Sequence, residues 1–316
     1  MLKKNKYKNG KKVQSDLYAP PDKGGVWGYA NVHHCRQILD ENGNVIESYC
    51  FSVDDSPVSD PRGIYRKIHK YENGKKVQLD EYALPGKGGI LGYANVHHCR
   101  RILDKNENII EQYYFGVDEA PVVDNDGVSN YKLKYENCRI VQADLYALTG
   151  KGGVGGNDKV HHSRQILDER ENVVEKYYFG VDETRIVDDN GVYVRKYKYE
   201  NGSRVQNDLY GLPGKGGVWG YAKVHHGRQI LDENGNVIEV YYFGVDDTPV
   251  ADFEGIYHKK NKYENGRKVQ RDLYGLPGKG GVWRHPNVHH IRQRFDKDGK
   301  VIEEMLFDFN EKELKE

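Results

Sequence analysis

Cysteine, methionine and tryptophan are scarce in this 316-residue chain, with four, two and three residues respectively. The four cysteines form no paired framework of the kind that staples small exported domains, which favours a reducing compartment. The N-terminal residues contain no apolar stretch that could serve as an export signal, and no run of 18 apolar residues occurs anywhere. We therefore expect a soluble protein without a membrane span, either cytoplasmic or exported by a non-classical route.

The chain also lacks net charge and lacks the apolar content of a large core. Its 48 basic and 48 acidic residues cancel, so it has no general polycation character, and we expect no nucleic-acid partner. Only 37% of the residues are hydrophobic and the mean hydropathy is -0.85. A modular array that buries a little surface in each unit fits these values.

What the sequence does contain is a strict internal period. Two adjacent histidines recur every 64 residues, with no insertion or deletion between any two occurrences. This spacing divides the chain into five copies, near 1–64, 65–128, 129–192, 193–256 and 257–316, and predicts a single repeat domain over 1–316. The pairs are His33-His34, His97-His98, His161-His162, His225-His226 and His289-His290.

Each copy contains two predicted β-hairpins. In the second copy, Asn73-Gly74 separates two β-prone runs, and Asn42-Gly43 does the same in the first copy. Asn-Gly is a strong hairpin signal because both residues tolerate positive φ. The third copy has Arg170-Glu171 at the second turn, so we expect a different or a strained turn there. The connectors are rich in glycine and proline, which excludes helix, and 310–316 is the one helix-like segment.

The predicted fold is all-β, with five tandem 64-residue repeats of two hairpins each in an open, solenoid-like hairpin array. Four strands in each of five copies also suit a five-bladed β-propeller, which is the alternative. The blades of a propeller are covered on both faces, whereas residues 257–263 are polar on both faces. A hairpin array that is solvated on one side tolerates such a strand better.

Two short motifs resemble known bacterial repeats. The segment 26–30, Val-Trp-Gly-Tyr-Ala, returns at 218–222 and resembles the bacterial WG repeat, with a long insertion before the following Asn-Gly turn. The segment 236–244 is similar to the aromatic hairpin of bacterial cell-wall-binding and clostridial-toxin repeats. Those families bind carbohydrate or choline with stacked hairpins, so the resemblance implies a multivalent binding solenoid.

The motif His-His-x-Arg occurs in all five copies and offers candidate ligand-binding residues. Neighbouring side chains of a strand point to opposite faces, so the two histidines of a pair cannot chelate one ion without a bulge. One histidine could pack between hairpins and bond to a neighbouring strand, or the second histidine and the arginine could face a ligand. The predicted ligand-binding residues are His34, Arg36, His98, Arg100, His162, Arg164, His226, Arg228, His290 and Arg292.

The motif Lys-Gly-Gly also recurs in every copy. Successive glycines can aim backbone N–H groups at an anion, and a nearby lysine would reinforce this. No Gly-Lys-Ser/Thr and no following helix is present, so the motif is not a P-loop, and a tight turn with a solvated lysine is the other interpretation. The candidate lysines are Lys23, Lys87, Lys151, Lys215 and Lys279.

These patterns favour a non-enzymatic, multivalent binding repeat protein whose ligand is a glycan or a partner protein. No serine or cysteine recurs beside a base, and a single active site needs asymmetry that identical copies do not offer. The first alternative is a purely structural, scaffolding array, in which rows such as Gln78, Asp80 and Tyr82 only tie hairpins together. The second is metal binding through the histidine pairs. We expect no catalytic residue and no cofactor.

Overall fold

The structure is a computed structural model, and it describes residues 2–20, 25–26, 29–86, 89–215, 217–278 and 281–314. The chain divides into two compact units, Met1–His162 and Ser163–Glu316. The division falls inside the third copy, one residue into a strand, rather than between copies. Each unit is described here by itself, and the single repeat domain stays a prediction.

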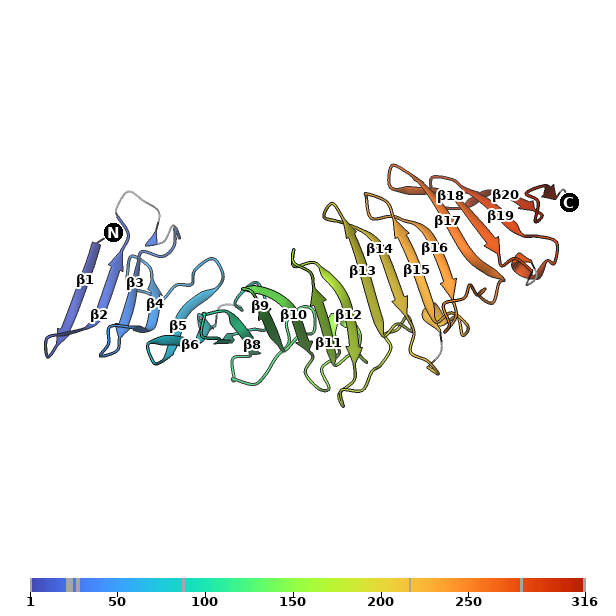
Figure 1. The fold of residues 1–316 in the computed structure, drawn as a ribbon. Helices are drawn as coiled ribbons and strands as arrows, with labels where there is room; N and C mark the ends of the chain where they lie inside the picture. Colours follow the sequence, from blue (N-terminus) through green and yellow to red (C-terminus); the bar gives the residue numbers. More distant parts are fainter. Residues whose placement is uncertain are drawn as a thin grey trace. The chain divides into compact units, whose positions relative to one another are not determined.

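The first unit is a row of antiparallel strands, each paired with its neighbour in the sequence (Figure 1). Two strands form each hairpin, and every pairing found among the described residues joins strands that are consecutive in the sequence. Its strands are β1 (Leu2–Lys8), β2 (Lys11–Tyr18), β3 (His34–Leu39), β4 (Val45–Phe51), β5 (Ile64–Glu72), β6 (Lys75–Ala83), β7 (His98–Leu103), β8 (Ile109–Phe115), β9 (Asn130–Glu136) and β10 (Arg139–Tyr146).

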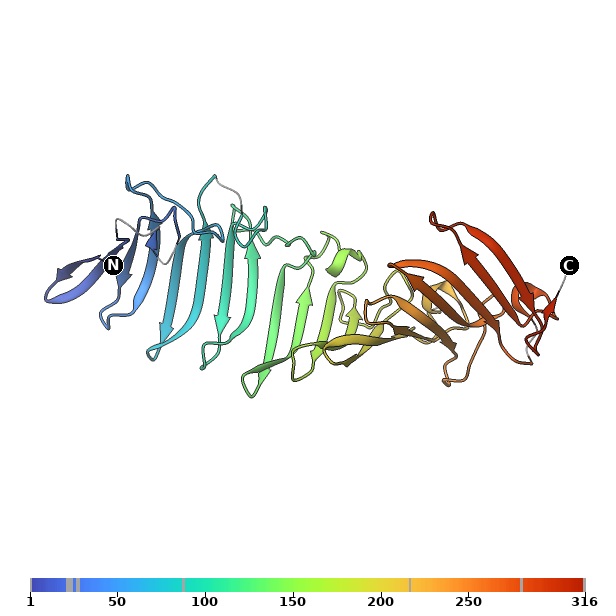
Figure 2. The ribbon, with the colours of Figure 1, turned by 90° about the horizontal axis from the view of Figure 1, so that it is seen from above.

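The second unit repeats this plan, and the short helix η2 (Val154–Gly156) lies just before it in the chain. Figure 2 shows the strands of each unit as a single layer. The strands are β11 (His162–Leu167), β12 (Val173–Phe179), β13 (Val194–Glu200), β14 (Ser203–Tyr210), β15 (His226–Leu231), β16 (Val237–Phe243), β17 (Ile256–Glu264), β18 (Arg267–Gly275), β19 (His290–Phe295), β20 (Val301–Phe307) and β21 (Glu313–Leu314), with the helices η3 (Val218–Gly220) and η4 (Val282–Arg284).

The open hairpin array predicted from the sequence is confirmed, and the propeller alternative is wrong. Within the residues described, no pairing between strands closes either row into a ring. The difference follows from solvation, because β13 and β17 alternate exposed and half-buried residues along their outer halves. Such strands can lie in a single layer but not between packed blades.

The hairpin turns have the backbone that the Asn-Gly signal predicts. Asn73 and Gly74 both have positive φ, 51° and 76°, as a two-residue type I′ turn requires. In the third copy Cys138 takes the place of the glycine at φ 63°. The second hairpin of that copy places Glu171 at φ 61°, where the first copy has Gly43 at 85°. The sequence predicts either a different turn or a strained one at this position, and the positive φ of Glu171 shows the strained turn.

The described residues that follow the Lys-Gly-Gly motif fold back onto one face of the sheet, which we call the connector face. Two apolar connector residues bond to each other, as in Val218 N–H to the Val224 carbonyl at 2.8 Å, and both are buried. At the second glycine of the motif, a Cβ on Gly217 would lie 1.6 Å from the backbone oxygen of Tyr221. The other four copies leave the same lack of space, at 1.4–1.6 Å. Close backbone approach therefore explains this glycine.

The connector face carries the core, which is divided among the copies. One cluster joins Val26, Val32, Cys35 and Cys50, and others gather around Ile90 and around Val218. The predicted helix-like tail is wrong: Glu313–Leu314 pairs with β20 as a short strand, because Leu314 packs against the last core cluster. Among the residues described, no helix is long and apolar enough to cross a membrane.

Candidate functional site

The second histidine of each pair lies on the opposite face of the sheet, which we call the histidine face. Its ring is stacked between two aromatic rings of the neighbouring strands. The centroid of His98 lies 4.1 Å from that of Tyr82 and 4.9 Å from that of Phe115. Strand register produces this, because Tyr82, His98 and Phe115 are cross-strand partners in one row. All five second histidines are buried, with 0–3% of their surface exposed: His34, His98, His162, His226 and His290.

In the second unit the stacked rings form one continuous ladder from β14 to β20, within the fourth and fifth copies. Neighbouring ring centroids lie 4.1–6.5 Å apart. Such contacts stabilise sheets by up to about 1 kcal/mol for each cross-strand pair. The ladder runs through Tyr210, His226, Phe243, Tyr241, His258, Tyr274, His290 and Phe307.

Carboxylates hold both nitrogens of the stacked histidine. The Nε2 of His98 lies 2.7 Å from Asp80 Oδ1, and its Nδ1 lies 2.7 Å from Glu119 Oε2. The same two-sided contact occurs at His226 and His290, with distances of 2.8–3.0 Å. A ring with a carboxylate against each of its two nitrogens has no nitrogen left to bind a ligand.

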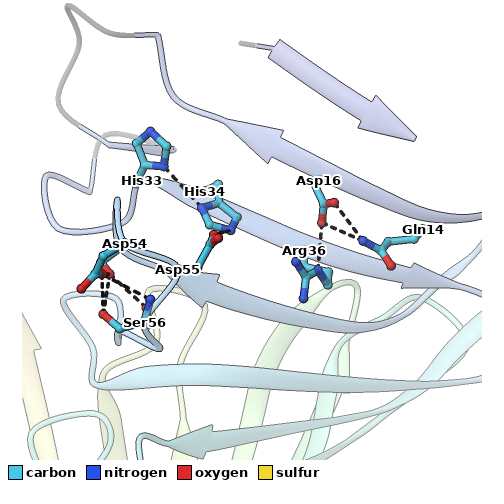
Figure 3. Close-up of polar contacts among 9 residues, drawn as sticks. Gln14, Asp16, His33, His34, Arg36, Asp54, Asp55 and Ser56 are labelled. Atoms are coloured by element: carbon cyan, nitrogen blue, oxygen red, sulfur yellow. Dashed lines mark hydrogen bonds and ion pairs between the residues drawn. The ribbon is translucent and has the colours of Figure 1, made fainter. Parts of the chain in front are cut away.

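The first copy departs from this arrangement. His34 Nε2 lies 3.1 Å from Asp55, and its Nδ1 lies 3.3 Å from Nδ1 of His33 (Figure 3). Burial lowers the pKa of His34, and the carboxylate of Asp55 opposes this effect. In Figure 3, Asp16 is bound by Gln14 and Arg36 instead. The histidine face of the first copy thus carries the same residue types as the other copies, but the buried histidine and the aspartate have different hydrogen-bond partners.

Arginine and glutamine complete the network around the buried aspartate. Arg228 Nε donates to Asp208 Oδ1 at 2.7 Å, and Gln206 Nε2 donates to Oδ2 at 2.6 Å. Burial raises the pKa of Asp208, but the hydrogen bonds from His226, Arg228 and Gln206 together hold it at about 2. Asp80 and Asp272 have the same partners and the same lowered pKa of about 2.

The predicted arginines lie beside the stacked histidines and are only half-buried. The guanidinium of each one covers the phenylalanine of the stack, with 5.1–5.7 Å between its central carbon and the ring centroid. The structure therefore brings the predicted histidine and arginine together, but the histidine is inside and bound to the protein itself. The arginines are Arg36, Arg100, Arg164, Arg228 and Arg292.

Of the predicted lysines, the two that the structure describes are less constrained than the arginines. Lys151 and Lys215 are exposed in the turn before the connector. Lys23, Lys87 and Lys279 lie outside the described residues. In the described part of the chain, no group of three or more histidine, cysteine, aspartate or glutamate side chains is arranged to hold a metal ion.

The first histidine of each pair directly precedes the strand and is half-buried. Both ring nitrogens of His97 and of His289 are shielded from solvent, and among the described residues neither ring has a hydrogen-bond partner. His289 also lines a cavity of about 460 Å³, together with Pro286 and Phe309. The remaining first histidines are His33, His161 and His225.

A repeated exposed site was missed in the sequence. The turn that follows the terminal phenylalanine of β4, β8, β12, β16 and β20 carries an apolar side chain at its apex, which we call the tip. It is among the most exposed large hydrophobic residues described, with 64–80% of its surface accessible. The signal was available, because an apolar residue precedes an acidic pair in the first four copies and Asn310-Glu311 in the fifth. The tips are Val53, Val117, Val181, Val245 and Phe309.

The tip is fixed to the sheet by the network beneath it. In the second copy, Gly116 N–H donates to the Ala120 carbonyl, and Glu119 closes the turn at φ 59°. The carboxylate of Glu119 then reaches down to the buried ring of His98. Asp247 and Glu311 make the same contact in the last two copies. The turn that presents the tip is therefore held by a backbone hydrogen bond across the turn and by a carboxylate contact to the buried histidine.

No protein-family model matches this chain, and no curated protein is similar enough to match it. The resemblance to WG and cell-wall-binding repeats therefore stays a prediction from short motifs.

Proposed function

We propose that this chain is a non-enzymatic, multivalent binding protein whose tips contact a partner protein. The observation that carries the proposal is exposure: an apolar tip is accessible at the same position of all five copies. Single exposed apolar residues are common on protein surfaces and need no explanation. Five at one repeated position give a regular pattern instead.

The repeated polar residues support the same division of roles. Histidine, aspartate and glutamine of the network bind to one another inside the sheet, and the arginine Nε joins them. They maintain the fold and leave the turns to face outward. The tips are aliphatic in four copies, and each is followed by acidic residues, as in Val245-Asp246-Asp247. An aliphatic group beside carboxylates suits an apolar pocket with a basic rim on a protein better than it suits a sugar ring.

Spacing supports multivalency within each unit. Four strands separate successive tips, so adjacent tips lie roughly 19 Å apart at about 4.8 Å per strand. The second unit carries three tips, Val181, Val245 and Phe309. Several weak contacts on one molecule raise the overall affinity without any new contact, provided that the geometry allows them to bind together.

The test replaces all five tips with serine and compares capture of proteins from the source cells by quantitative mass spectrometry. The matched control replaces five exposed apolar residues whose high exposure does not recur at the same position of the other copies: Leu2, Tyr7, Phe253, Val301 and Ile302. We expect a partner that the natural chain and the control retain and that the tip variant loses. Equal capture by both variants, or binding on a glycan array that the tip variant keeps, would contradict the proposal.

A purely structural array is the second candidate, and the saturated hydrogen bonds of the histidine network favour it. If the array is purely structural, no captured partner distinguishes the tip variant from the control variant. Substitutions in the histidine network, rather than at the tips, then change a measurable property, which is the stability of the fold.

A further inference from the structure

Two cysteines face each other on the connector face of the first copy. Cys35 on β3 and Cys50 on β4 are cross-strand register partners, and their sulfur atoms lie 3.8 Å apart. Both thiols are buried, with 1% and 9% of the residue surface exposed, in the cluster formed with Val26 and Val32. Neither takes part in the histidine network, which lies on the other face.

We propose that Cys35 and Cys50 are a redox-sensitive pair that forms a reversible cross-strand disulfide when the protein meets a peroxide. Antiparallel register partners have Cα atoms about 4.5–5.5 Å apart, and disulfides span about 4.4–6.8 Å between Cα atoms. The backbone already satisfies that requirement. Rotation of the two side chains is enough to shorten the sulfur separation to about 2.05 Å.

Cys50 is the thiol that a small oxidant can reach. It lines a cavity of about 300 Å³ with Tyr49, Tyr65 and Lys67. The other copies carry a larger residue at the position of Cys50, as with Tyr242 in the fourth copy, where the ring fills the core. A peroxide molecule is little larger than water and fits a cavity of this size.

The contact between the two sulfur atoms shifts the pKa values of the two thiols in opposite directions. The hydrogen bond from Cys35 lowers the pKa of Cys50, against the opposing effects of burial and of Asp60. The same contact, together with burial, raises the pKa of Cys35. Because the thiolate is the reactive form, Cys50 is the nucleophile and Cys35 the resolving thiol.

The chemistry balances with hydrogen peroxide as the oxidant. The Cys50 thiolate attacks one peroxide oxygen, the O–O bond breaks, and a sulfenic acid and hydroxide form. Cys35 then attacks the Cys50 sulfur, the S–O bond breaks, and water leaves as the disulfide forms. In total, two thiols and one peroxide give one disulfide and two waters, so the protein loses two electrons and two protons.

The chain contains internal controls. Cys99 occupies the position of Cys35 in the second copy, but its cross-strand partner there is Tyr114. Cys138 lies alone in an exposed turn. A peroxide that acts on thiols indiscriminately would modify the exposed Cys138 first, whereas the proposed pair joins before Cys99 reacts.

The experiment treats the reduced, full-length protein with hydrogen peroxide, blocks the remaining thiols under denaturing conditions and maps peptides without reduction. Arg36 lies between the two cysteines, so trypsin separates them unless they are linked. We expect one linked pair, Cys35 with Cys50, a mass loss of about 2 Da from the two lost hydrogens, and alkylated Cys99. Absence of this link while Cys138 is oxidised would overturn the proposal.

Two variants sharpen the result. Cys35→Ser removes the resolving thiol, so we expect a sulfenic acid on Cys50 that dimedone traps and no linked peptide. Cys50→Tyr reproduces the Cys-Tyr pair of the second copy, so the fold tolerates it and Cys35 stays reduced. If Cys35 is oxidised equally in the Cys50→Tyr variant, the pair has no special reactivity and the proposal is wrong.

Discussion

The substitution Asp208→Asn tests whether the buried aspartate network holds the sheet together. The side chain of Asp208 is 13% exposed and accepts hydrogen bonds from His226, Arg228 and Gln206. Its pKa falls from 3.8 to about 2 in the folded chain. Since each pKa unit corresponds to about 1.4 kcal/mol, the charged form contributes about 2 kcal/mol to the free energy of unfolding at neutral pH.

The sign of the pH dependence follows from the lowered pKa. A carboxyl whose pKa is lower in the folded state stabilises the fold fully above its unfolded pKa of 3.8. That stabilisation decreases as the pH falls and is lost through the folded pKa of about 2. Asparagine does not titrate, so the free-energy difference between Asp208→Asn and the natural chain must shrink in the same window.

The assay is urea unfolding followed by tryptophan fluorescence at pH 7, 5, 3.5 and 2.5. We expect Asp208→Asn to cost about 2 kcal/mol at pH 7 and less than about 1 kcal/mol at pH 2.5. The control Glu233→Gln removes an exposed carboxyl of the same copy and should change stability by less than about 0.5 kcal/mol. A cost for Asp208→Asn that stays constant with pH would refute the charge-based account.

Three further predictions concern glycine positions and are checked by the same unfolding measurement. Gly217→Ala should lower the free energy of unfolding by more than about 3 kcal/mol or prevent folding, because its Cβ would meet the backbone oxygen of Tyr221. The control Gly211→Ala introduces the residue that three other copies have at this position and should be nearly neutral. Cys138→Gly should stabilise the chain by about 1 kcal/mol, because φ is positive there. Glu171→Gly should do the same at its own turn, and a loss of stability in either variant would show that the turn is unstrained.

The sequence predicts the hairpins well because their signals are local. Asn73-Gly74 needs only its own backbone to form a turn, and the 64-residue period then sets the order of the strands. The predicted sharing of a face by His34 and Arg36 follows from strand alternation alone. These features require no knowledge of how distant residues pack.

The site depends on register and could not be predicted in the same way. Whether His98 meets Tyr82 or a residue one step away is decided by the register of β6 against β7 and by the connector between these two strands. The loop carboxylate of Glu119 reaches the ring only because a left-handed residue bends the turn back over the sheet. The second glycine of each Lys-Gly-Gly is likewise required by the close approach of a backbone oxygen, and only the folded connector brings that oxygen near.

The carboxylate that fastens each turn to a stacked histidine has a consequence for association. A free loop loses conformational entropy when a partner immobilises it, at about 0.5–1.5 kcal/mol for each flexible side chain. Glu119 and Glu311 are already held by His98 and His290, so the chain has met part of this cost during folding. A molecule that binds the turns therefore meets preorganised surfaces. Several modest binding energies can then add together, because less of each is lost in ordering a mobile loop.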